Sequence, residues 1–252
     1  MNQQPPGSDP APGILHLLAS PIGNLEDITL RALRTLKECD VVAAEDTRRT
    51  GQLLRHFGIA KPIFSCFQFN EARRGEEIVH RMRRGQNVAL VTDAGSPGIS
   101  DPGERVVRSV LAAGLRVEPV PGPCALIAAL TASGLSTSEF HFAGFLPHKS
   151  AQRRRKLESL ESATGTLVLY ESPYRVMKLL DEVREVLGDR TIVLARELTK
   201  LHEEFRRGTA QELLAGAPKG GWKGEFVVLI ESAARPGRTC PDSKCPPDPT
   251  LF

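Results

Sequence analysis

Several features that mark common classes of protein are absent from this sequence. No apolar run approaches the roughly 18 residues that a membrane-spanning helix needs. The first dozen residues, MNQQPPGSDPAP, lack the basic and apolar regions of a signal peptide. We therefore expect a cytoplasmic protein. Its polar, proline-rich ends, residues 1–13 and 233–252, are predicted to be a disordered leader and a disordered tail.

Four common catalytic signatures are missing as well. The first apolar stretch runs into SPIGNL, which has one glycine and is not the G-x-G-x-x-G of dinucleotide-binding folds. There is no G-x-x-x-x-G-K-[ST] phosphate loop, His202 begins HEEFR rather than H-E-x-x-H, and no nucleophile elbow marks a Ser–His–Asp set. These absences argue against a typical NAD enzyme, a P-loop nucleotidase, a zinc protease and an α/β-hydrolase.

The five cysteines do not form a metal-ligand pattern. Cys39, Cys66 and Cys124 stand singly in globular-looking segments, where small buried thiols are expected. Cys240 and Cys245 lie in the proline-rich tail with no second pair and no histidine beside them. We therefore predict no metal site.

Charge of one sign does not dominate the sequence. The net charge is +3 and the isoelectric point is about 8.7, a mildly basic balance that is compatible with nucleic acid binding. The basic residues are clustered, however, in RRR (153–155) followed by Lys156, in ARRGEE, in RMRRGQ and in EEFRRG. Such clusters are typical either of solvated helix faces or of a surface for an anionic partner.

What the sequence does contain is a regular alternation of strand-like and helix-like stretches. Strands are predicted over 14–20, 41–46, 88–95 and 116–122, and a helix capped by Asn24 is predicted over 24–40. Three further helices are expected over 50–58, 76–85 and 103–114. This α/β alternation predicts a mostly parallel sheet covered on both faces, with a ligand site at the carboxyl ends of its strands.

The pattern changes near residues 120–124, where we expect a domain boundary. Residues 14–121 would form an N-terminal α/β domain and residues 122–232 a C-terminal one. Strands in the second half are predicted over 140–147, 166–172, 190–198 and 225–232, and helices over 121–134, 151–163 and 175–188. The β-branched content of these strands indicates a second sheet, partly antiparallel.

Four segments at the ends of predicted strands carry residues suited to a ligand site, namely 19–32, 43–54, 90–103 and 120–129. In LVTDAGSPGISDPG (90–103) the glycines permit close backbone approach and the prolines fix the path. Asp93 and Asp101 could accept hydrogen bonds from a ligand, or only from the amides of their own loop. The acid pair after the second strand, Glu45 and Asp46, precedes two arginines, which is typical either of a site or of a surface ion-pair cluster.

These segments resemble those of the tetrapyrrole methylase superfamily. Within it they are most similar to the branch that methylates the ribose 2′-hydroxyl of a cytidine in 16S rRNA. The resemblance spans residues 14–231 and is carried by PIGNLEDIT, AAEDTRRTG, DAGSPGISDPG, PGPCALIAAL, GFLPHK, YESPYR, ARELTK and KGEFVVLIE. A methyltransferase for a small tetrapyrrole and a non-catalytic ribosome-binding relative remain the alternatives.

The resemblance implies a two-domain tetrapyrrole-methylase-like fold, in which each domain is a sheet flanked by helices and the cofactor cleft lies between them. It implies S-adenosylmethionine as the methyl donor and a homodimer that acts on 16S rRNA within the 30S subunit. The residues that it assigns to the donor are Pro21, Ala94, Gly95, Ser96, Ile99, Cys124, Ala125, Tyr170, Glu171, Glu225 and Phe226.

Methylation of a ribose hydroxyl calls for a group that accepts its proton. The candidates in this sequence are Glu45, Asp46, Asp93, Asp101 and Glu71. Close relatives often carry histidines where this chain has Phe67 and Phe69, so a histidine base is not expected there. Candidate RNA contacts, through phosphate charge, are Arg48, Arg49, Arg153, Arg154, Arg155, Lys156, Arg196 and Lys200.

Overall fold

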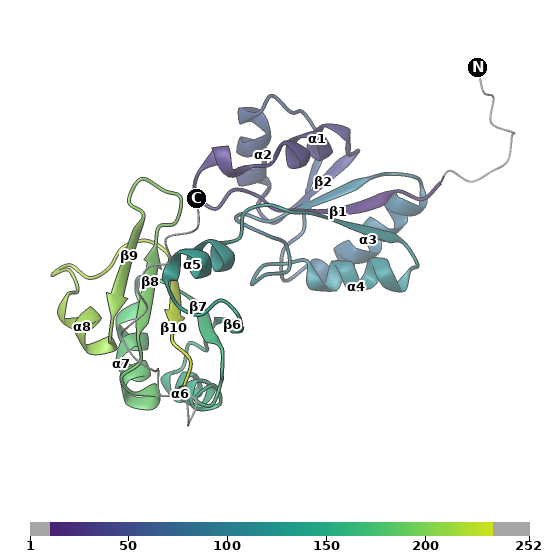
Figure 1. Ribbon diagram of the computed structural model, residues 1–252. Coiled ribbons are helices and arrows are strands. Elements are labelled where there is room, and N and C mark those ends of the chain that lie inside the picture. The colour runs from purple at the N-terminus through teal and green to yellow at the C-terminus, as the bar shows by residue number, and fades with distance from the viewer. Residues whose placement is uncertain (1–10, 234–252) are drawn as a thin grey trace, which may run out of the picture.

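The computed structural model describes residues 11–233, which form two five-stranded sheets with helices packed on them (Figure 1). Most of the predicted leader and tail, together with Cys240 and Cys245, lies outside these described residues. None of the described helices is long and apolar enough to cross a membrane.

The first sheet has the strand order β3-β2-β4-β1-β5, and all of its neighbouring pairs are parallel. The predicted parallel sheet is therefore confirmed. Both β2 and β4 are buried over their whole length, as expected for strands covered on both faces. The strands are β1 (Ile14–Leu18), β2 (Val41–Ala44), β3 (Ile63–Ser65), β4 (Val88–Val91) and β5 (Arg116–Val120).

Helices cover both faces of this sheet. On one face the apolar sides of α1 and α2 pack around Leu36 and Leu54, and on the other those of α3 and α4 pack around Ile78 and Val106 (Figure 1). The elements are η1 (Leu25–Asp27), α1 (Leu30–Glu38), α2 (Thr47–His56), α3 (Glu71–Arg83) and α4 (Glu104–Ala112).

The prediction of one helix over 24–40 was wrong in its first turn. Asn24 does cap a helix, because its side chain accepts from the amide of Glu26, but that helix is only the short 3₁₀ turn η1. The backbone is extended at Ile28 and Thr29, and Thr29 then caps α1 by accepting from the amide of Ala32. Two competing cap residues five positions apart thus divide the segment.

The second sheet has the order β6-β7-β10-β8-β9 and is mixed. Only β6 and β7 are parallel, whereas β10 is antiparallel to both β7 and β8, and β8 is antiparallel to β9. The predicted partly antiparallel sheet is confirmed, and β9 is an addition to it. The strands are β6 (Phe140–Phe145), β7 (Thr166–Glu171), β8 (Ile192–Arg196), β9 (Glu204–Gly208) and β10 (Phe226–Ile230).

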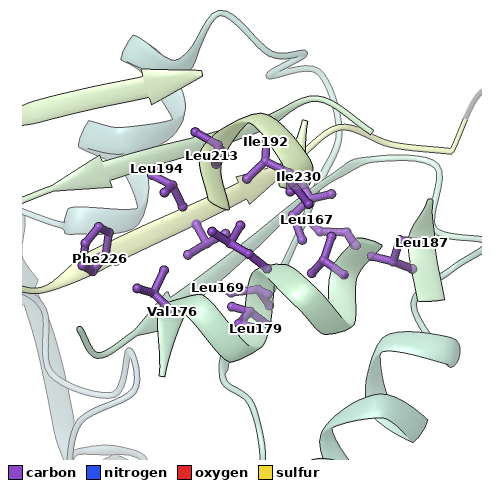
Figure 2. Packing of buried hydrophobic residues seen from close by; sticks show 14 of the residues in the cluster. Leu167, Leu169, Val176, Leu179, Leu187, Ile192, Leu194, Leu213, Phe226 and Ile230 are labelled. Carbon is purple, nitrogen blue, oxygen red and sulfur yellow. The ribbon is translucent and has the colours of Figure 1, made fainter. Parts of the chain in front are cut away.

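The two faces of this sheet have separate cores. Helices α6 (Ser150–Glu158), α7 (Val176–Leu187) and α8 (Ala210–Ala215) cover one face, where Leu179 of α7 packs beside Leu169 of β7 (Figure 2). Helix α5 (Ala125–Ser133) follows directly after the first sheet in the chain but packs on the opposite face of the second sheet. The start of α5 therefore lies at the junction of the two sheets (Figure 1).

Candidate active-site cleft

A cleft of about 520 Å³ lies at this junction, within the usual size range of small-molecule sites. On the side of the first sheet it is lined by residues that follow the carboxyl ends of β2 and β4. On the side of the second sheet it is lined by the ends of β7 and β8, the start of β10 and the start of α5. On the side of the first sheet the cleft thus lies at the carboxyl ends of parallel strands, where the ligand site was expected.

The loop between β4 and α4 forms one wall of the cleft, and its shape depends on glycine. Gly95 has a φ of +82°, and its amide and carbonyl form reciprocal hydrogen bonds with Ser20 at 3.0 and 2.9 Å. The Ser20 hydroxyl also donates to the carbonyl of Thr92. These bonds attach the loop to the end of β1, so main-chain groups form much of this wall.

Tyr170 organises the opposite wall. Its hydroxyl accepts a hydrogen bond from the amide of Leu126 at 3.1 Å, which fixes the first turn of α5 against β7. The rings of Phe142 and Phe145 pack edge-on against it at 5.0 and 5.6 Å. Burial raises the pKa of Tyr170, so the phenol stays protonated and neutral.

Three carboxyl groups, of Glu45, Asp93 and Asp101, line the cleft on the side of the first sheet. Glu45 accepts from the amide of Asp93, and Asp93 in turn accepts from the amide of Asp46 and lies 3.5 Å from Arg49 Nη1. Asp101 lines the same cleft, and no hydrogen bond from the described residues reaches its carboxyl group. Desolvation, with the negative charges of Glu45 and Asp93, raises the pKa of Asp101 to about 7. Burial also raises the pKa of Glu45. The cluster therefore contains one unbonded carboxyl group that titrates near neutral pH.

Two other candidate bases lie outside the cleft lining. The Asp46 carboxylate caps α2 by accepting from the amide of Arg48 and pairs with that residue's guanidinium, which lowers the pKa of Asp46. Glu71 is the first residue of α3, and its buried Oε1 accepts from amides in the first turn of α4, at Gly103 (2.7 Å) and Arg105 (3.0 Å). The expectation that Glu71 belongs to the reacting groups is therefore wrong, because its carboxylate serves as a cap supplied by another helix.

Replacing Glu71 by alanine tests this structural role. Helix α4 has no cap of its own, since its N-cap is Gly103, so the free energy of unfolding is expected to fall by about 0.5–2 kcal/mol. Urea denaturation followed by circular dichroism measures this. Glu76→Ala, at an exposed position of α3, the helix that also contains Glu71, is the control. Equal stability of the two variants would contradict the role.

Two of the expected RNA contacts, Arg49 and Lys200, line the cleft itself. Lys200 bonds to Glu197 and Glu225, Arg196 pairs with Glu204, and Arg48 pairs with Asp46. On α6, Arg154 pairs with Glu185, and Arg155 and Lys156 are exposed.

The expectation for Arg153 was wrong. Its side chain is 4% exposed, and its guanidinium forms two hydrogen bonds to the equally buried Glu182 of α7. It also donates to the carbonyls of Pro147 and His148. Arg153 thus joins α6, α7 and the preceding loop and presents no charge to a polyanion.

The predicted donor residues converge on the cleft. Ten of them line it: Ala94, Gly95, Ser96, Ile99, Cys124, Ala125, Tyr170, Glu171, Glu225 and Phe226. Pro21 instead lines an adjoining hollow. Cys39 and Cys66 are buried as predicted, whereas Cys124 is only half-buried. Among residues 11–233 no group of three or more His, Cys, Asp or Glu side chains could hold a metal ion.

The chemistry of the cleft fits a cationic cofactor with an aromatic group. Glu45 and Asp93 supply negative charge for a sulfonium. Leu198 and Phe226 supply apolar surface on the side of the second sheet, where a flat ring can be covered. The residues present therefore fit S-adenosylmethionine.

Comparison with known proteins agrees with this geometry. The sequence model of the family described as Tetrapyrrole (Corrin/Porphyrin) Methylases matches residues 15–214. The chain belongs to this family. The structure of the methylase CobJ has a TM-score of 0.66 at 18% identity and covers 88% of this chain and 95% of its own. Uroporphyrin-III C-methyltransferase from Thermus thermophilus, solved with S-adenosyl homocysteine, has a TM-score of 0.62 at 21% identity. The match covers 86% of this chain and 97% of that protein. These two neighbours show that the fold is that of the methylases.

Curated relatives are much closer in sequence. The ribosomal RNA small subunit methyltransferase I of Halalkalibacterium halodurans is 48% identical over 87% of this chain and 76% of its own length. The protein of the same name from Escherichia coli O157:H7 is 46% identical over 91% of this chain and 81% of its own length. This tetrapyrrole methylase therefore belongs to the same family as these relatives.

In the loop after β8, Lys200 was predicted as a site residue, but Glu197 and Leu198, which also line the methylase cleft, were missed from the sequence. Glu197 and Thr199 have φ values of +50° and +62°, which are unusual without glycine, and Glu197 accepts hydrogen bonds from Lys200 and from the amide of Glu225. A Cβ on Gly23 would lie 2.5–2.9 Å from this loop. The segments ARELTK and PIGNLEDIT are therefore in contact. The sequence feature that could have indicated this contact is Gly23, since a larger residue there would collide with the other segment.

Proposed function

We propose that this methylase transfers the methyl group of S-adenosylmethionine to the ribose 2′-hydroxyl of a cytidine in 16S rRNA, in the cytoplasm and within the small ribosomal subunit. The observation that carries the proposal is the carboxyl group of Asp101, which lines the cleft together with Glu45 and Asp93 and accepts no hydrogen bond from the described residues. Further support comes from the printed name of relatives at 46–48% identity, ribosomal RNA small subunit methyltransferase I.

In this reaction the cofactor supplies an electrophilic methyl group that already carries its leaving group. The chain has to align the ribose oxygen with that methyl group, and alignment of this kind is worth roughly 7–11 kcal/mol. Asp101 accepts the hydroxyl proton as the new O–C bond forms and is neutral afterwards. Glu45 and Asp93 favour the cationic donor over its neutral product. Desolvation, with the charges of these two carboxylates, raises the pKa of Asp101 to about 7.

The main-chain walls of the cleft are suited to holding the donor. Gly95, Cys124 and Phe226 come from three different elements and line one cavity. For the RNA, Arg49 at the cleft and the exposed Arg155 and Lys156 of α6 are the proposed phosphate contacts. We include a homodimer in the proposal on the strength of the family resemblance, and light scattering on the purified protein tests it.

The decisive experiment uses labelled S-adenosylmethionine and 30S subunits from a strain that lacks this methylation. The proposal expects label in 16S rRNA, at the 2′-oxygen of one cytidine when the modified nucleotide is mapped. Label in a porphyrin precursor but not in RNA would instead favour a small-molecule methylase, the activity named for one fold neighbour. Binding of the donor without transfer to either substrate would favour a non-catalytic relative.

A further inference from the structure

A second hollow, of about 350 Å³, adjoins the cleft in the first lobe. It lies between the segment after β1, which contributes Pro21 and Leu25, and helix α2, which contributes Gln52 and His56. Of the residues assigned to the donor only Pro21 lines this hollow, and the proposed base Asp101 does not line it. The hollow therefore has room for another part of the reacting complex.

Helix α2 presents one of its faces to this hollow. Arg49, Gln52, Leu53 and His56 are spaced three, four and seven positions apart, so they lie along one side of the helix. The other side of α2 is held in the core by the buried Leu54. These polar side chains thus project from a helix whose position is fixed.

The hollow and the cleft meet at one ion pair. Arg49 and Asp93 line both spaces, and Arg49 Nη1 lies 3.5 Å from Asp93 Oδ2. Asp93 belongs to the same carboxyl cluster as Asp101. A ribose whose 2′-oxygen reaches Asp101 carries its base on the neighbouring ring carbon, so that base must enter a space directly beside the cluster.

The residues of the hollow suit a nucleobase. Proteins that bind unstacked RNA bases stack them on aromatic side chains, including histidine, or on arginine, and read their edges by hydrogen bonds. His56 provides a planar ring, Leu25 and Leu53 provide apolar surface, and the Gln52 amide offers both a donor and an acceptor.

We propose that this hollow receives the base of the nucleotide whose ribose is methylated, with His56 covering its face and Gln52 bonded to its edge. This inference rests on the proposed function and specifies its substrate site. It makes Gln52 and His56 binding residues for the substrate and gives them no contact with the methyl donor.

The test compares Gln52→Ala and His56→Ala with the wild-type protein on 30S subunits. Each variant is expected to lower kcat/KM for 30S subunits roughly 5- to 150-fold, the range for loss of one base contact. The affinity for S-adenosylmethionine, measured by calorimetry, should not change. Arg55→Ala, an exposed position of α2 outside the hollow, is the matched control for loss of a side chain near the RNA.

A second arm uses 30S subunits reconstituted with 16S rRNA that carries an abasic ribose at the methylated position. The wild-type protein should lose activity on this RNA, and His56→Ala should lose little more, because both changes remove the same contact. Unchanged activity of both variants on normal subunits, or additive losses on the abasic RNA, would overturn the inference. If the wild-type protein transfers no label to 30S subunits at all, the proposed function itself fails and the base site falls with it.

Discussion

Replacement of Asp101 by asparagine is expected to lower kcat about 100- to 10,000-fold, the usual contribution of a positioned general base. Asparagine has nearly the same shape but cannot accept the hydroxyl proton. Donor affinity should be retained, since the walls of the cleft are largely main chain and the neighbouring Glu45 and Asp93 remain. Single-turnover transfer to 30S subunits, with calorimetry of the donor, measures the two quantities separately.

The pH dependence gives this prediction a second readout. The base acts in its deprotonated form, so wild-type kcat/KM should rise with pH and reach half its plateau near pH 7. The Asn variant should lack this rise.

The free energy of unfolding should fall as pH rises, whereas kcat/KM increases. The folded-state pKa of Asp101 is raised, so the folded protein binds this proton more tightly than the unfolded chain and loses stability as pH rises towards 7. Asp101→Asn should therefore unfold at a higher temperature than the wild type at pH 8. Glu104→Gln, which alters an exposed carboxylate at the start of α4, is the control for the stability measurement.

Methyl transfer by Asp101→Asn at the wild-type rate would refute the assignment of Asp101 as the base.

The second large effect concerns stability alone. Arg153→Ala is expected to lower the free energy of unfolding by about 3–5 kcal/mol, because it leaves the buried Glu182 carboxylate without its partner. Burial acts to raise the pKa of Glu182, but hydrogen bonds from Arg153 and Ser150 outweigh it and hold that pKa below its ordinary value. In the wild type this contribution is present at neutral pH and is lost as pH falls through the lowered pKa.

Urea denaturation of Arg153→Ala and Arg155→Ala, two positions apart on α6, distinguishes the loss of a buried ion pair from the loss of a positive charge alone. Arg155 is exposed, so its removal should change the stability by no more than about 0.5 kcal/mol. The double variant Arg153→Met with Glu182→Leu should regain much of the loss, because apolar residues of similar volume can replace a buried ion pair. Equal stability of the two alanine variants would contradict the buried pair.

The first sheet follows from regular sequence patterns, whereas the edge strands β3 and β9 do not. The parallel sheet was predictable because β1, β2 and β4 are apolar runs that alternate with patterned helices. Strand β3 has three residues, too few for any period to emerge. Within the basic cluster EEFRRG, the residues EFRRG form the edge strand β9, whose charged side chains resemble those of a solvated helix.

Site residues that belong to local motifs could be predicted from the sequence. The roles of residues whose partners lie far away in the chain could not. Gly95 and Phe226 were found through the resemblance, and the structure brings them to one cavity. Nothing near Arg153 in the sequence indicates that its partner lies 29 residues away on another helix. The cap formed by Glu71 likewise depends on a helix that begins more than 30 residues later. The raised pKa of Asp101 results from its burial in the folded cleft and from the nearby charges of Glu45 and Asp93, none of which the local sequence reveals.

The outermost strands of the two sheets have a consequence for self-association. An unpaired strand edge can recruit a strand from another molecule, and each edge here carries a feature that hinders this. Strand β3 is very short, β5 contains Pro119 between charged and apolar residues, β6 is bulged between Phe142 and Gly144, and β9 is charged. These features hinder edge-to-edge pairing of the described sheets between copies of this chain.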